Sequence, residues 1–114
     1  AQQLADQFAF HGPIAACSFS ALSTSFDLVI NATSASLNAD VPPIPACVFG
    51  PDSLAYDIMY GAQATVFMQF AVQHGAQTCD GLGMLVEQAA AAFYLWRGVR
   101  PETSTVLADL RGAL

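Results

Sequence analysis

Residues 26–34 read Phe-Asp-Leu-Val-Ile-Asn-Ala-Thr-Ser, and this stretch decides the class of fold. Its apolar centre runs without alternation, which is typical of a parallel strand that is buried on both faces. The apolar run stops at Asn31, and small polar residues follow it. We therefore predict a strand over residues 26–31 whose carboxyl end opens into a polar loop.

Strand and helix patterns alternate on both sides of this stretch. Other apolar or β-branched runs predict strands over residues 14–17, 54–58 and 77–79. Helical spacing predicts helices over residues 1–10, 65–74, 84–96 and within 102–110. Thr65 is placed to cap the second helix, Gly98 ends the third, and Pro101 fits the first turn of the last. The alternation predicts an α/β fold, with a doubly wound parallel sheet and helices on both of its faces.

The composition of the chain is unusually apolar. Of its 114 residues, 54% are hydrophobic and 11% are charged. A soluble domain carries about 25% charged residues, and disordered chains need still more charge and less apolar surface. The chain is therefore either a small apolar domain or, as we favour, part of something larger whose apolar surface is covered.

The charged residues exclude several classes of function. The net charge is −6, with three arginines and no lysine. Binding to a nucleic-acid backbone and lysine-dependent chemistry both need cations that the chain lacks. Two stretches without charge, residues 7–26 and 58–79, contain glycine, histidine and amide or hydroxyl side chains, so we predict that neither spans a membrane. We expect a cytoplasmic protein that binds no nucleic acid and no membrane.

The residue types that most often bind zinc are spread too widely to form a metal site. They are Cys17, Cys47, Cys79, His11 and His74. No C-x-x-C pair occurs, and the histidines are not at zinc-ligand intervals from the cysteines. We predict that the cysteines are buried free thiols and that the histidines end helices.

Small and polar residues follow three of the predicted strands, at residues 31–34, 59–61 and 80–83. In parallel sheets ligands bind beyond the carboxyl ends of the strands, and small residues let a flat ligand approach the backbone. Each of the three segments could also be an ordinary turn or helix entry.

A polar side chain, Gln88, falls on an otherwise apolar face of the helix predicted over residues 84–96. The other residues of that face are Leu85, Ala92 and Leu95. A buried amide must be hydrogen-bonded, since leaving it unpaired costs about 1–3 kcal/mol. Gln88 is therefore either a satisfied core glutamine or an amide presented to a ligand. In the second case Tyr60 could offer its hydroxyl to the same ligand.

Three motifs, in this order and spacing, resemble the C-terminal portion of shikimate dehydrogenase. They are residues 26–34, quoted above, residues 55–60 (Ala-Tyr-Asp-Ile-Met-Tyr) and residues 80–90 (Asp-Gly-Leu-Gly-Met-Leu-Val-Glu-Gln-Ala-Ala). The resemblance implies an NADP-dependent oxidoreductase that interconverts 3-dehydroshikimate and shikimate, in the route to aromatic amino acids. It also implies a Rossmann-like sheet.

The resemblance assigns roles to individual residues. Tyr60 and Gln88 resemble substrate contacts. Residues that resemble cofactor contacts are Ala32, Thr33, Ile58, Gly81 and Met84, with Gly81 near the nicotinamide amide and Met84 near the ring. Two departures from the family pattern are Ile58, where methionine is usual, and Val66, where proline is common. Both changes should be mild, because Ile is close to Met in size and Thr65 can still cap the helix.

The resemblance also implies parts that residues 1–114 do not carry. These are an N-terminal substrate domain with the catalytic lysine and aspartate, the glycine-rich pyrophosphate turn, and an Asn-Arg-Thr segment for the 2′-phosphate. Residues 1–114 are then expected to be the C-terminal part of an NADP-binding domain plus C-terminal helices, with no catalytic or metal-binding residue. Alone, we expect them to bind NADP weakly and to be inactive.

The expected sheet lacks its first two strands. The strand predicted over residues 14–17 would then lie about 14 Å from residues 26–31. It would be displaced, disordered or paired with another copy in a homo-oligomer. Two alternatives remain open, namely a catalytically silent interaction or assembly module and a quinate/shikimate dehydrogenase paralogue.

Overall fold

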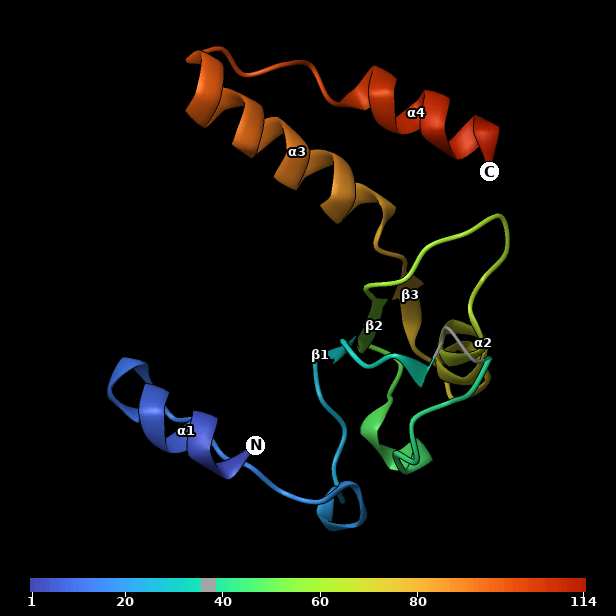
Figure 1. Ribbon diagram of the computed structural model, residues 1–114. Helices are drawn as coiled ribbons and strands as arrows, with labels where there is room; N and C mark the ends of the chain where they lie inside the picture. Colours follow the sequence, from blue (N-terminus) through green and yellow to red (C-terminus); the bar gives the residue numbers. More distant parts are fainter. Residues whose placement is uncertain (36–38) are drawn as a thin grey trace.

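The computed structural model describes residues 1–35 and 39–114 and has a small parallel sheet at its centre (Figure 1). The strands are β1 (Leu28–Asn31), β2 (Leu54–Asp57) and β3 (Gln77–Cys79), in the spatial order β1-β2-β3. Both pairings are parallel, and Leu54 of β2 faces Leu28 of β1 and Gln77 of β3. The predicted fold class, a partial parallel α/β sheet flanked by helices, is confirmed.

One face of the sheet is covered by α2 (Val66–Gln73). Ala55 of β2 is fully buried, and Phe67 and Ala71 of α2 pack in the same core. The turn before β2 adds Val48 and Phe49, whose ring meets that of Phe67 edge-on with centroids 5.9 Å apart. Edge-to-face rings and close-packed apolar side chains make this the hydrophobic core of the chain.

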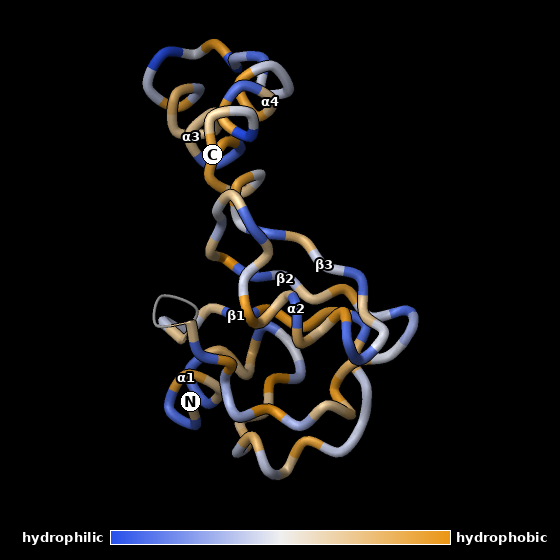
Figure 2. The backbone as a smooth tube through the Cα atoms, turned by 90° about the vertical axis from the view of Figure 1, so that its right-hand side faces the viewer, coloured by the Kyte–Doolittle hydropathy of each residue, from blue (hydrophilic) through white to orange (hydrophobic). Residues whose placement is uncertain are grey.

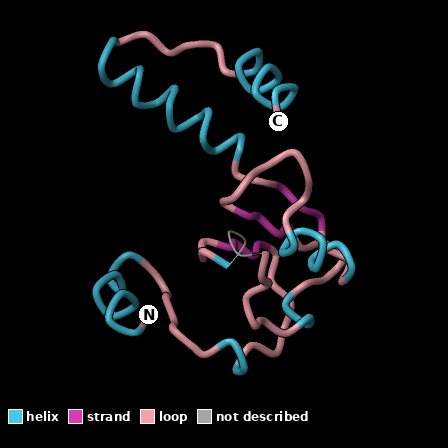
Figure 3. Tube along the Cα trace, turned by 45° about the vertical axis from the view of Figure 1, so that its right-hand side comes forward, coloured by secondary structure: helices cyan, strands magenta, loops and turns pink. Residues whose placement is uncertain are grey.

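The other face of the sheet is open in the structure. Leu28 and Ile30 of β1 are 51% and 57% exposed, and Leu54 is also exposed. The prediction of a strand buried on both faces is therefore wrong, and its first two residues lie outside β1. The physical reason is that α2 lies against one face, whereas α1 (Gln2–Phe8) lies on the other side but away from the strands (Figures 1 and 3).

Residues 14–17 form no strand, so that prediction is wrong. Strands exist by bonding to a neighbour, and in the described sheet β1 pairs with β2 alone, so residues 14–17 bond to no strand. The helix predicted over residues 1–10 consists of α1 and a 3-10 turn over Ala9–His11, followed by Gly12 and Pro13.

The remaining helices agree with their sequence signals, with two differences. Thr65 caps α2, because its Oγ1 accepts a hydrogen bond from the Met68 N–H at 3.3 Å. The long helix α3 (Leu82–Arg97) begins two residues before the predicted start and ends at Gly98, which has a left-handed φ of 70°.

The last helix, α4 (Ser104–Ala113), begins later than predicted, so Pro101 lies before it. The connection is held by Glu87 of α3, which accepts hydrogen bonds from Thr103 Oγ1 at 2.6 Å and Arg100 Nη2 at 2.8 Å. Glu102 then accepts the N–H of Ser104 at 2.8 Å. These bonds fix the connection between the two helices.

Together α3 and α4 form a two-helix arm that projects from the sheet, joined to it by a narrow connection (Figure 2). The three cysteines are free but exposed, which corrects the prediction that they are buried. Cys17 lies on a loop, Cys47 in the 3-10 turn Ala46–Val48 and Cys79 at the end of the short strand β3. In the described part of the chain, no helix is long and apolar enough to cross a membrane.

Candidate functional site

The carboxyl ends of the three strands meet at one edge of the sheet, as parallel strands require. Two backbone bonds extend this edge into the loops: the Ile58 N–H donates to the Asn31 carbonyl at 3.1 Å, and the Gly81 N–H donates to the Met59 carbonyl at 3.0 Å. The segments after β1, β2 and β3 are therefore neighbours. This is where ligands bind in open parallel sheets.

The predicted cofactor contacts lie along this edge. Ala32 and Thr33 follow β1 and are exposed, while Ile58 follows β2 and is half-buried. Gly81, at the start of α3, is brought against Ile58. Met84, one turn into α3, is 42% exposed. The edge is thus accessible and lined by small or flexible side chains.

Gly81 is required by a close approach of two backbones. A Cβ on Gly81 would lie 2.6 Å from the carbonyl carbon of Ile58 and closer still to its oxygen. Real side chains do not tolerate such contacts, so the start of α3 can sit on the end of β2 only with glycine. At Gly83, by contrast, an added Cβ would meet nothing within 4 Å.

The two predicted substrate contacts come from different elements. Tyr60 lies in the loop after β2 and is 41% exposed. Gln88 lies seven residues after Gly81, which places it on nearly the same side of α3 and about 10 Å farther along the helix. Both side chains are exposed.

The alternative that Gln88 is a satisfied core glutamine is wrong. Gln88 is exposed, and Leu95 on the same face is 82% exposed. The buried face of α3 carries Leu82, Val86 and Ala90, about a third of a turn or more away from Gln88. The Gln88 amide therefore faces solvent in the structure and needs no internal partner.

Asp57 is a buried residue of this site that the sequence patterns did not single out. Its side chain is fully buried at the end of β2. It accepts hydrogen bonds from Thr65 Oγ1 at 2.6 Å, the Met59 N–H at 3.1 Å and Asn31 Nδ2 at 3.3 Å. The available signal was an acidic residue inside an otherwise apolar strand, eight residues before a helix-capping threonine.

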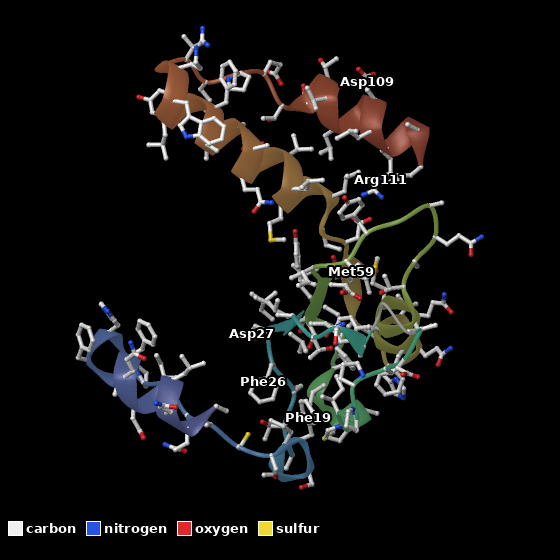
Figure 4. The ribbon with its side chains drawn as sticks, in the orientation of Figure 1. Phe19, Phe26, Asp27, Met59, Asp109 and Arg111 are labelled. Carbon is white, nitrogen blue, oxygen red and sulfur yellow. The ribbon has the colours of Figure 1, made fainter. Side chains whose placement is uncertain are left out.

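An ion pair joins this edge to the C-terminal helix. Arg111 of α4 donates to both carboxylate oxygens of Asp80, at 2.6 and 2.7 Å, and Asp80 also accepts the Leu82 N–H at 3.3 Å. The Arg111 hydrogen bond, aided by that of Leu82, lowers the pKa of the Asp80 carboxyl. Figure 4 shows Arg111 directed toward the sheet edge, where Met59 lies. The pair holds the end of α4 against the start of α3.

Two hollows accompany these elements. One, of about 430 Å³, lies beside Asp80 and Arg111 and is lined by residues 61–64, Met68, Thr78 and Cys79. The other, of about 390 Å³, lies between α3 and α4 and is almost wholly apolar.

Within residues 1–35 and 39–114, no group of three or more His, Cys, Asp or Glu side chains is arranged to hold a metal ion. His11 and His74 end a 3-10 turn and α2, as predicted.

A parallel sheet with a crossover helix and small residues at its carboxyl edge is the arrangement of Rossmann-like α/β folds. The family model described as the shikimate 5′-dehydrogenase C-terminal domain matches residues 81–111. The chain is 60% identical over its whole length to shikimate dehydrogenase (NADP(+)) from Herminiimonas arsenicoxydans and covers 42% of that protein. The chain thus spans about two fifths of the length of such relatives.

Solved structures agree with these matches. An Ael1 enzyme from Pseudomonas putida matches with a TM-score of 0.88 and 47% identity, covering 96% of this chain and 41% of that one. Shikimate 5-dehydrogenase from Thermus thermophilus, in complex with NADP(H) and shikimate, matches with a TM-score of 0.80 and 33% identity, covering 100% of this chain and 42% of that one. The chain therefore matches the C-terminal portion of the shikimate dehydrogenase family, and the predicted resemblance is confirmed.

Proposed function

We propose that residues 1–114 are the C-terminal part of the NADP-binding domain, with the C-terminal helices, of an NADP-dependent shikimate dehydrogenase. The observation that supports the proposal is the sheet edge, where backbone hydrogen bonds and the close fit of Gly81 on Ile58 bring together the segments after β1, β2 and β3. Similarity over the whole of residues 1–114 to part of relatives that bear this name supports it. The reaction proposed is the reversible reduction of 3-dehydroshikimate to shikimate in a cytoplasmic enzyme.

The residues at the edge divide the work between two ligands. Ala32, Thr33, Ile58, Gly81 and Met84 would hold the nicotinamide end of NADP(H), which supplies the hydride chemistry when bound. Tyr60 and Gln88 would bind hydroxyl or carboxylate groups of the substrate, since both side chains donate and accept hydrogen bonds. Residues 1–114 would orient the ligands, and the proton transfer would depend on groups from an N-terminal substrate domain.

The open face of the sheet supports the same proposal. Leu28, Ile30 and Leu54 form a contiguous apolar surface across β1 and β2. Surfaces of this kind are normally covered by protein. In the proposed enzyme the cover is the part of the protein that residues 1–114 do not include, and a second copy of the chain is the alternative cover.

The proposal is tested by shikimate-dependent reduction of NADP+ in the complete protein, with Tyr60→Phe and Gln88→Ala as variants. Loss of one substrate hydrogen bond should lower kcat/KM about tenfold or more. Tyr94→Phe on α3 and Gln73→Ala at the far end of α2 make the same chemical changes away from the edge and should leave kcat/KM within about twofold of wild type.

Three outcomes would contradict parts of the proposal. Equal activity of all variants would remove the assignment of Tyr60 and Gln88. Reduction of NADP+ with quinate as readily as with shikimate would indicate the broader paralogue. No activity with either substrate in the complete protein would favour a silent assembly module, and size-exclusion chromatography would then show whether two copies associate.

A further inference from the structure

A buried carboxylate connects the cofactor side of the candidate site to its substrate side. We infer that Asp57 is the positioning residue of this site: it holds the segment after β1 and the segment after β2 in one fixed arrangement. The inference rests on the proposed function for the identity of the two ligands. The geometry that carries it consists of the hydrogen bonds that meet on this one side chain.

The first connection runs from Asp57 to Thr33 through Asn31. Asn31 Oδ1 accepts hydrogen bonds from the Thr33 N–H at 3.1 Å and from the Thr33 hydroxyl at 2.7 Å. These two donors fix the orientation of the amide, so that Nδ2 donates to Asp57 Oδ1. The loop that carries Ala32 and Thr33 is thereby tied to the end of β2.

The second connection runs from Asp57 to Gly81 through the backbone of Met59. The Met59 N–H donates to Asp57 Oδ1, and the Met59 carbonyl accepts the Gly81 N–H. Because Met59 lies between Ile58 and Tyr60, these two bonds set the path of the chain on both sides of it. One carboxylate oxygen thus links the predicted cofactor contacts to Tyr60.

The third connection fixes the start of α2. Thr65 Oγ1 donates to Asp57 Oδ2 and at the same time accepts the Met68 N–H as the helix cap. A carboxylate has two oxygen atoms that accept hydrogen bonds, so it can satisfy these three donors at once. An amide in its place has one acceptor atom and would set its NH₂ group against one of the donors. Asp57, with two acceptor oxygens, therefore fits this position better than an amide of the same shape.

The experiment compares Asp57→Asn with Asp109→Asn in the complete protein. Asp109 is exposed on the outer side of α4, so the control makes the same chemical change away from the site (Figure 4). The measurements are the dissociation constant of NADP+ by calorimetry, the KM for shikimate, and the melting temperature. All affinities are taken well below that temperature, so that the folded protein alone is compared.

We expect Asp57→Asn to weaken NADP+ binding and to raise the KM for shikimate, each by about tenfold, because a shift of about 1 Å in a positioned group can cost up to 10²-fold. Asp109→Asn should change neither by more than about twofold. A lower melting temperature with both affinities unchanged would show a structural role only and would overturn the inference. An effect on one ligand alone would also overturn it.

A second pair of variants decides the matter if Asp57→Asn does not fold. Thr65→Val removes the hydroxyl that donates to Asp57, whereas Thr65→Ser keeps it. The inference requires the valine variant to bind both ligands more weakly than wild type and the serine variant to bind them nearly as wild type does. Wild-type protein without shikimate-dependent activity would instead contradict the proposed function, which separates the two failures.

Discussion

The unit formed by the sheet and α2 differs sharply from the arm formed by α3 and α4. In the sheet unit Ala55, Phe67 and Ala71 are buried to 1% exposure or less around one core. At the far end of the arm Leu95 and Trp96 are 82% and 79% exposed. The first region has a core of its own, whereas the second depends on its attachment.

This difference shows how the candidate site is built. The sheet unit fixes the backbone after β1 and β2, where Thr33 and Tyr60 lie. Gln88 is placed only by the direction in which α3 leaves the sheet. Contacts at the base of α3 set that direction, among them the Gly81 N–H bond to the Met59 carbonyl, the fit of Gly81 on Ile58 and the ion pair between Asp80 and Arg111. The position of the arm relative to the sheet is therefore determined by the contacts at its base.

The largest effect is expected from removing a core side chain of the sheet unit. Phe67→Ala should lower the free energy of unfolding by about 3–5 kcal/mol, since it deletes a buried ring and leaves a cavity. Trp96→Ala, at the exposed end of the arm, should change it by about 0.5 kcal/mol or less. Urea unfolding of the chain of residues 1–114, followed by circular dichroism, measures both. Similar losses for the two variants would abolish the contrast between the regions.

A smaller effect is expected at the base of the arm. Gly81→Ala should lower the free energy of unfolding by about 1–3 kcal/mol, because the new methyl group must push α3 away from the Ile58 carbonyl. Gly83→Ala meets nothing and should leave stability equal or raise it by up to about 1 kcal/mol, since Ala favours the helix. The same urea titration compares them. If Gly81→Ala is as stable as wild type, the base of the arm is looser than the structure shows.

The smallest effect is expected from the ion pair, and it depends on pH. The Arg111 hydrogen bond holds the pKa of Asp80 lower in the folded chain than in the unfolded one. The folded state then binds fewer protons, so the stabilisation is complete above the unfolded value of about 3.9 and is lost as pH falls through the folded pKa. The pair is partly exposed, with Arg111 48% and Asp80 12% exposed, so its contribution is small.

The measurement compares wild type with Arg111→Gln by urea unfolding from pH 7 to pH 3. Wild type should unfold at higher urea concentration near neutral pH, and the gap should close in the acid range. Arg97→Gln removes an equal charge at the far end of α3 and should show no such closing gap. A gap that is constant with pH would indicate that Arg111 acts through packing and not through Asp80.

Local signals in the sequence predicted most of the elements correctly. Thr65 caps α2 and Gly98 ends α3, because caps and terminators act through neighbouring backbone groups. The short strand over residues 77–79 was also predicted. The prediction of a strand over residues 14–17 was wrong, because a strand needs a bonded neighbour and pairing is a property of the whole fold.

The candidate site divides in the same way. The segments that form the site could be predicted, because the three motifs at residues 26–34, 55–60 and 80–90 and their order are visible in the sequence. The exposure of Gln88 could not be predicted, because helical periodicity shows which residues share a face of the helix but not what covers that face. Asp57 could not be ranked above other acidic residues, since the donors that meet on it come from residues up to 26 positions away.

By itself, the sequence determined the class of fold, the ends of the helices and the segments that carry the candidate site, because these depend on local spacing and backbone chemistry. The tertiary structure decided which side of α3 faces solvent, which carboxylate is buried among donors, and which glycine is needed for two backbones to touch. These features arise when segments distant in the sequence are brought within van der Waals and hydrogen-bond range, and folding alone sets those distances.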